Sequence, residues 1–113
     1  MANEIPTKSR QQVKARDMET CLMCGMSGNA WHHRRRRAVK SGHFQHCACN
    51  GVLLCSTDHA WVHAHPVEAM ANGFILSTIT KNPHEHPVRT FAGWFTLTCD
   101  GESIPCADPK EAP

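Results

Sequence analysis

The chain has 113 residues and no tyrosine, and aromatic residues make up only 6% of it. A chain of this length can form one small domain, and with so few aromatic residues its hydrophobic core must be thin. Small domains with thin cores are usually stabilised by disulfides or by bound metal. The seven cysteines and nine histidines could supply either kind of cross-link.

The sequence also lacks a long apolar run. Its first twenty residues are polar, without the apolar segment of a secretory signal, and no stretch has the length of a transmembrane helix. We therefore expect a cytoplasmic protein that does not contact a membrane. Thiols stay reduced in that compartment, and an odd number of cysteines would leave one thiol without a disulfide. Metal ligation therefore explains the cysteines better than disulfides do.

Neither sign of charge is in large excess, since the net charge is only +2. The basic residues are nevertheless concentrated in one segment, whereas the acidic residues are scattered or lie near the C-terminus. A run of this kind is most often a solvated surface, and contact with nucleic-acid phosphates is the functional alternative. The segment contains Arg34, Arg35, Arg36, Arg37 and Lys40.

Apolar periodicity and turn residues predict an α+β domain. The expected helices cover residues 8–19, 57–64 and 66–71, and the expected strands cover 29–35, 52–55, 74–80, 88–91 and 94–99. Thr7 is expected to cap the first helix, and Ser56 or Thr57 the second. The last two strands form a hairpin. We expect a single domain with a core of about residues 17–75, a β-rich extension over 76–106, and tails at 1–6 and 107–113.

The expected hydrophobic core contains the three tryptophans and four further apolar residues. These are Trp31, Trp61, Trp94, Leu53, Val62, Phe74 and Ile75. Cys99 and Cys106 are expected to be plain buried thiols. No role is assigned to the remaining histidines, which are His43, His46, His65, His84 and His86.

Cys21-Leu-Met-Cys24-Gly25 has the form of a zinc knuckle, in which a tight turn presents two thiolates to one ion. The alternative is a redox dithiol of the thioredoxin type, but no βαβ pattern surrounds this segment. One such pair is only half of a zinc site, so further ligands are needed.

Two pairs of histidines supply candidate ligands of another kind. His59 and His63 lie four residues apart on a predicted helix, so both imidazoles project from one face. Such a pair alone is more often a surface feature than a metal site. His32 and His33 are adjacent on a predicted strand and therefore point to opposite faces.

The order of these motifs resembles the HNH endonuclease family, which has a ββα-metal fold, and is most similar to small HNH proteins of phages and prophages. The resemblance spans roughly residues 17–75 and rests on several motifs in the right order. The residues that carry it are Cys21, Cys24, Gly25, His32, His33, Arg34, Asn50, Leu54, Cys55, His59 and His63.

The resemblance implies a catalytic centre. His33 would be the general base that activates water, and the side-chain amide of Asn50 would orient it. His32, His59 and His63 would hold one divalent ion, either zinc, manganese, nickel or magnesium, on the scissile phosphate. An exchange of roles between His32 and His33 stays open. A further alternative is that all four histidines bind one structural zinc.

The resemblance also implies a structural zinc, held by Cys21, Cys24 and Cys55. The family pattern would have a second knuckle, but this chain has Asp58 where its last cysteine should be. Asp58 is the first choice for the fourth ligand, Cys49 or Cys47 is the second, and the third possibility is that no zinc binds here.

The activity implied is hydrolysis of DNA phosphodiester bonds, with the basic segment from Arg34 to Lys40 on the phosphates. A monomer would nick DNA and a dimer could cut both strands, and the sequence does not define the oligomeric state. A phage packaging terminase is the partner that the resemblance suggests. The alternatives are a non-catalytic, zinc-stabilised DNA-binding module and a structural zinc domain for protein contacts.

Overall fold

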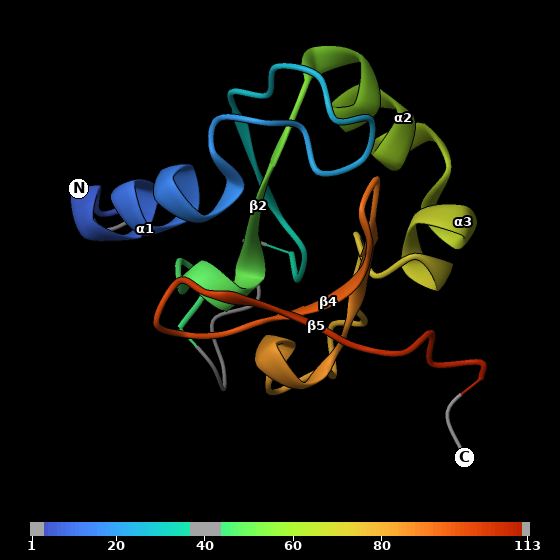
Figure 1. The fold of residues 1–113 in the computed structure, drawn as a ribbon. Coiled ribbons are helices and arrows are strands. Elements are labelled where there is room, and N and C mark those ends of the chain that lie inside the picture. The colour runs from blue at the N-terminus through green and yellow to red at the C-terminus, as the bar shows by residue number, and fades with distance from the viewer. Residues whose placement is uncertain (1–3, 37–43, 112–113) are drawn as a thin grey trace.

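The computed structural model describes residues 4–36 and 44–111. Two of the predicted DNA-contacting residues, Arg37 and Lys40, lie outside this part of the chain. The elements confirm the predicted α+β class (Figure 1). In chain order they are α1 (Thr7–Asp17), β1 (Ala30–His33), the 3-10 turn η1 (Ala48–Asn50), β2 (Gly51–Leu54), α2 (Ser56–Ala64), α3 (Pro66–Ala71), the 3-10 turn η2 (Pro83–Glu85), β3 (Val88–Thr90), β4 (Gly93–Leu97) and β5 (Ser103–Pro105).

The first sheet is the antiparallel pair of β1 and β2, in which Trp31 lies opposite Leu53 and His33 lies opposite Gly51. Gly51 permits a close contact with the indole of Trp31, because a Cβ at this position would lie 2.1 Å from a ring carbon. The chain then passes directly from β2 into α2. This order brings the His32–His33 strand and the helical histidines close together, as the sequence predicts.

The second sheet has the order β3-β4-β5 and lies at the lower side of Figure 1. The predicted hairpin is confirmed, since Arg89 pairs with Trp94 and the turn contains Gly93, whose φ is +117°. The third strand, β5, was not predicted. It has only three residues and all are exposed, so it lacks the apolar alternation by which a strand is recognised in a sequence.

The main hydrophobic core lies between β2, α2 and β4, and includes Val52, Leu54, Val62, Phe74 and Leu97. A smaller cluster lies under α1. The expected tryptophan core is wrong in part, because all three tryptophans are only half-buried, as is Ile75. Trp61 and Ile75 pack against the main core and Trp31 against the smaller cluster, whose interiors are filled mainly by aliphatic side chains.

Three local predictions need correction. The N-cap of α2 is Cys55 rather than Ser56 or Thr57, and its Sγ accepts a hydrogen bond from the backbone N–H of Asp58 at 3.4 Å. Residues 74–80 form no regular strand and make only an isolated bridge from Leu76 to Arg35. Likewise, α1 starts at Thr7 and the cap position is Pro6. No helix within the described ranges combines the length and apolar character needed to cross a membrane.

Candidate metal centres and catalytic cleft

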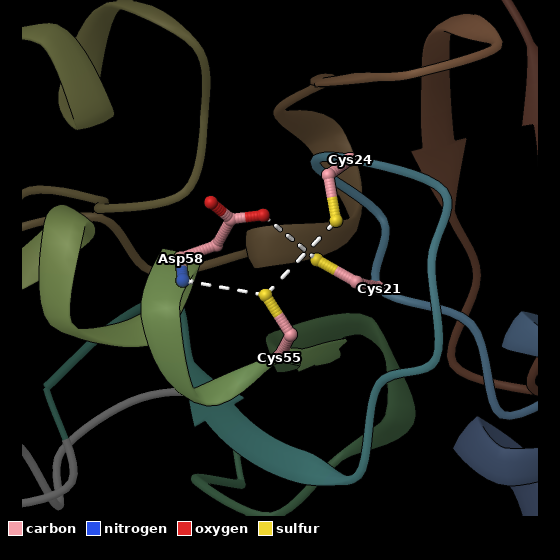
Figure 2. A group of neighbouring side chains, drawn as sticks. All are labelled: Cys21, Cys24, Cys55 and Asp58. Carbon is pink, nitrogen blue, oxygen red and sulfur yellow. Dashed lines mark hydrogen bonds between the residues drawn. The ribbon is translucent and has the colours of Figure 1, made fainter.

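The first cluster joins the Cys-x-x-Cys turn to the start of α2 (Figure 2). Its potential ligand atoms all lie within 4.8 Å of one another. The Sγ atoms of Cys24 and Cys55 are 4.0 Å apart, and Cys21 Sγ is 3.2 Å from Asp58 Oδ2. Tetrahedral zinc with bonds of about 2.3 Å holds sulfur ligands about 3.8 Å apart. The cluster therefore has the composition and spacing of a structural zinc site, with Asp58 as its fourth member.

Backbone hydrogen bonds explain why this cluster forms. Gly25 donates to the carbonyl of Cys21 at 2.8 Å and closes the turn, with φ at +81°. Leu22 donates to the carbonyl of Leu53 at 3.0 Å, which attaches the turn to β2. Because Cys55 immediately follows β2, the three thiols are brought together. Burial raises the pKa of Cys21 to about 12, so its thiolate needs a cation beside it.

The second cluster contains His32 from β1 and His59 and His63 from α2. Ring centroids are 5.2 Å apart for His32 and His59, 5.6 Å for His32 and His63, and 4.9 Å for the helical pair. The members of this group are the three residues predicted as ligands. His33 is not a member of this group, and its ring contacts Trp31 and His46 instead, in accord with the alternation of side chains along a strand.

His32 is prepared for metal binding by its surroundings. Its Nε2 lies 2.6 Å from the backbone carbonyl of Phe74, and a carbonyl only accepts hydrogen bonds. Nε2 must therefore carry the proton, which leaves Nδ1 as the ligand atom. Burial is the main cause that lowers the pKa of His32 to about 4, so the ring is neutral at pH 7 as a metal ligand has to be.

His33 and the histidine cluster line one cleft of about 710 Å³, together with Arg36. His33 Nε2 is 3.1 Å from Nδ1 of His46, which is fully buried and packs edge-on against Phe44. No role could be assigned to His46 from the sequence, because the loop that carries it has no regular periodicity. One ring must donate to the other, and this bond holds the imidazole of His33 in a fixed orientation.

Asn50 connects the end of β1 to the loop that precedes η1. Its side-chain oxygen accepts from the backbone N–H of Arg35 at 2.7 Å. Its amide nitrogen donates to the carbonyls of Arg35 at 3.2 Å and Gln45 at 2.9 Å. The side chain therefore fixes both segments next to His33 and His46. This arrangement is the loop-pinning role expected for Asn50, and its importance for catalysis stays a prediction.

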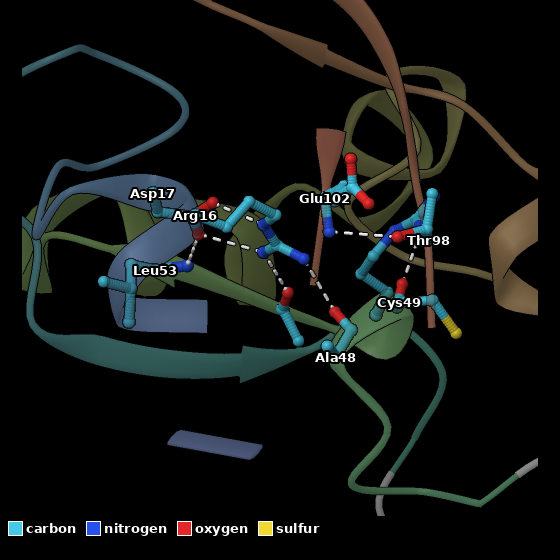
Figure 3. A network of polar contacts seen from close by, with 9 residues as sticks. Arg16, Asp17, Ala48, Cys49, Leu53, Thr98 and Glu102 are labelled. Atoms are coloured by element: carbon cyan, nitrogen blue, oxygen red, sulfur yellow. Dashed lines mark hydrogen bonds and ion pairs between the residues drawn. The ribbon is translucent and has the colours of Figure 1, made fainter. Parts of the chain in front are cut away.

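A buried ion pair fixes α1 against the base of this site (Figure 3). Arg16 Nε lies 2.6 Å from Asp17 Oδ1, and the side chains of both residues are buried. Arg16 also donates to the carbonyls of Ala48 at 2.7 Å and Gly51 at 2.6 Å, while Asp17 accepts from the backbone N–H of Leu53 at 3.1 Å. The pair thus holds η1, which ends at Asn50, and the following strand β2 in one position.

The prediction that Arg34 and Arg35 contact DNA phosphates is wrong in this structure. Each residue is only 1% exposed. Arg35 donates from Nη1 to the carbonyl of Thr80 at 2.8 Å. The guanidinium of Arg34 donates to five backbone carbonyls, those of Cys49, Gly73, Pro83, His86 and Pro87. Burial lowers the pKa of Arg34 to about 9. The guanidinium is therefore still charged at neutral pH.

Among the residues of the basic segment that the structure describes, Arg36 remains available to a phosphate, because it is exposed and lines the cleft beside His33.

The chain matches no protein-family model, no curated protein and no solved structure. Conclusions about function therefore depend on the geometry of the site.

Proposed function

We propose that the chain is a metal-dependent endonuclease of the HNH kind, built on a ββα-metal centre, that hydrolyses phosphodiester bonds of DNA. The observation that carries this proposal is the gathering of His32, His59 and His63 from a strand pair and the following helix, with His33 in the same cleft. A site that only stabilises the fold would have no need for a fourth imidazole placed beside an open cleft.

The donor set suits a catalytic ion. Catalytic metal centres commonly have three protein ligands and keep one position open to solvent or substrate. His32, His59 and His63 supply three imidazoles at the edge of a cleft. A divalent ion held by them would supply positive charge to the scissile phosphate and to the leaving 3′ oxygen. Imidazole ligands favour zinc, nickel or manganese over magnesium.

His33 is the residue that we assign as general base. It takes a proton from the attacking water as the new bond from oxygen to phosphorus forms and the bond to the 3′ oxygen breaks. His46 acts as a positioning residue through its hydrogen bond to the His33 ring. Arg36 binds a phosphate oxygen at the rim of the cleft and so holds the strand near His33.

The experiment that tests the activity uses supercoiled plasmid. Wild-type protein is incubated with manganese, nickel, zinc or magnesium, and with EDTA as a control. We expect metal-dependent nicking that is reduced about 100-fold or more in His33→Ala. His86→Ala, which changes an exposed histidine outside the cleft, should nick like the wild type.

The alternatives give different results in the same experiment. If the wild type is inactive with every metal and yet retards DNA on a gel, the chain is a zinc-stabilised DNA-binding module. If it neither cleaves nor binds DNA, the chain is a structural domain and the proposal fails.

The role of His46 has its own test. Glutamine can keep a hydrogen bond to His33, whereas leucine of similar size cannot. We expect His46→Leu to nick more slowly than the wild type and His46→Gln to recover most of the rate, with equal thermal unfolding of both variants. Equal rates for both variants would exclude a positioning role.

A further inference from the structure

We infer that the chain holds a second structural zinc through four side chains, which are Cys47, Cys49, His84 and Cys99. This site is separate from the knuckle and from the histidine cluster. It lies at the junction between the first sheet and the C-terminal sheet. The inference does not depend on nuclease activity.

The three Sγ atoms of Cys47, Cys49 and Cys99 lie within 4.8 Å of one another and could hold one ion, and His84, which contacts Cys99, is the candidate for the fourth position. Cys49 Sγ is 3.5 Å from Cys47 Sγ and 3.9 Å from Cys99 Sγ, and Cys99 Sγ is 3.7 Å from His84 Nδ1. Around tetrahedral zinc, two sulfur ligands lie about 3.8 Å apart, and a sulfur and an imidazole nitrogen about 3.5 Å apart. Three thiols and one imidazole form one of the usual ligand sets of structural zinc.

The four residues come from three segments that are distant in the sequence. Cys47 is the residue before η1 and Cys49 lies within it, His84 lies in η2, and Cys99 follows β4. The three segments pack against one another. Figure 3 shows Cys49 beside Thr98, the residue that precedes Cys99. A zinc ion here would cross-link the C-terminal sheet to the segment that carries Asn50.

Hydrophobic packing does not account for this cluster. Cys49 is buried among the aliphatic residues of the main core, but Cys99 is exposed and Cys47 and His84 are half-buried. None of the seven cysteines, all within the described residues, forms a disulfide in this structure. A cation shared by the side chains gives one reason for all four positions.

The electrostatics of the cluster agree with this assignment. Close thiols resist becoming thiolates together because their negative charges repel. A divalent cation removes that repulsion, and thiolates are the form in which cysteine binds zinc.

The first test counts zinc in the purified full-length chain by elemental analysis and native mass spectrometry, after the more weakly held ion of the histidine site is removed with a mild chelator. We expect two zinc ions per wild-type chain. Cys99→Ser, which changes an exposed side chain and opens no cavity, should lose one. Cys24→Ser should lose the other, and Cys106→Ser should lose neither.

Two further variants examine His84. His84→Ala should lose the second zinc, whereas His84→Cys should retain it because four thiolates also bind zinc. If Cys99→Ser and His84→Ala both hold as much zinc as the wild type, the inference is overturned. It is also overturned if the wild type binds one zinc and its intact mass is two hydrogens lower than that of the reduced chain, since a disulfide would then explain the close thiols.

A second measurement avoids any substitution in the proposed site. Cobalt(II) is added to metal-free protein that carries both Cys24→Ser and His59→Ala, in which the knuckle and the histidine cluster are both disabled. Tetrahedral cobalt bound by thiolates absorbs strongly in the visible range, so saturation at one equivalent is the expected result. If no such absorption develops, these four side chains do not bind metal.

Discussion

Because Arg34 is buried, we predict that it stabilises the fold. Its place in a run of arginines predicts instead that it contacts DNA phosphates. Its three side-chain nitrogens serve five backbone carbonyls, so Arg34→Lys keeps the charge but concentrates all donors on one nitrogen. Carbonyls around at least two of the three nitrogen positions then lose their donor. A hydrogen bond from a charged group contributes about 1.5–3 kcal/mol, so we expect a loss of about 3–6 kcal/mol in the free energy of unfolding.

Arg36→Ala is the matched control, because Arg36 lies two residues further along the same run and is exposed at the cleft. We expect its unfolding free energy to stay within about 0.5 kcal/mol of the wild type. Its affinity for DNA should fall at all sequences, and the slope of log affinity against log salt should decrease in magnitude by about one.

Urea denaturation at a fixed zinc concentration measures the first quantity, and fluorescence anisotropy with a labelled duplex at several salt concentrations measures the second. The reasoning is refuted if Arg34→Lys unfolds within about 1 kcal/mol of the wild type while its DNA affinity falls as that of Arg36→Ala does. Arg34 would then be a phosphate contact, as its position in the sequence suggests.

Three further predictions concern stability and metal binding. Asp17→Ala leaves the buried charge of Arg16 without its counter-charge, so the free energy of unfolding in urea should fall by about 3–5 kcal/mol. Asp58→Ala should weaken zinc binding to the knuckle in a chelator competition, whereas Asp58→Cys should retain or strengthen it; equal affinity for both variants would remove Asp58 from the ligand set. The third prediction concerns pH in the presence of EDTA. His32 has a pKa of about 4 in the folded protein against 6.5 ordinarily, so the unfolded chain takes up this proton first as the pH falls. About 3 kcal/mol of stability should therefore be lost between pH 6.5 and pH 4, and a His32→Gln protein should show a correspondingly smaller loss over that range.

The local pattern of the sequence was sufficient for several features of the site. A spacing of four residues on a helix puts His59 and His63 on one face whatever the rest of the chain does. Adjacent residues on a strand point in opposite directions, so the rings of His32 and His33 had to make different contacts. The Cys-x-x-Cys turn likewise brings two thiols together through its own backbone. In each case the geometry follows from a few consecutive residues.

Other features depend on how distant segments pack, and no local pattern specifies that. Arg34 reads as a surface charge beside three other arginines, yet the carbonyls that surround it come from η1, the end of α3, η2 and the segment before β3. Cys99 lies far from Cys47 and Cys49 in sequence and meets them only because η1 and β4 pack together. The partner of His33 was missed for the same reason, since His46 lies in an irregular loop.

The sequence by itself therefore determined the kinds of ligand and the short-range pairs, because backbone geometry fixes the directions of neighbouring side chains. The tertiary structure alone decided which arginines are buried and that Cys47, Cys49 and Cys99 form a second group of thiols. These outcomes depend on contacts between segments that lie tens of residues apart, where packing and burial, and not spacing along the chain, set the environment of each side chain.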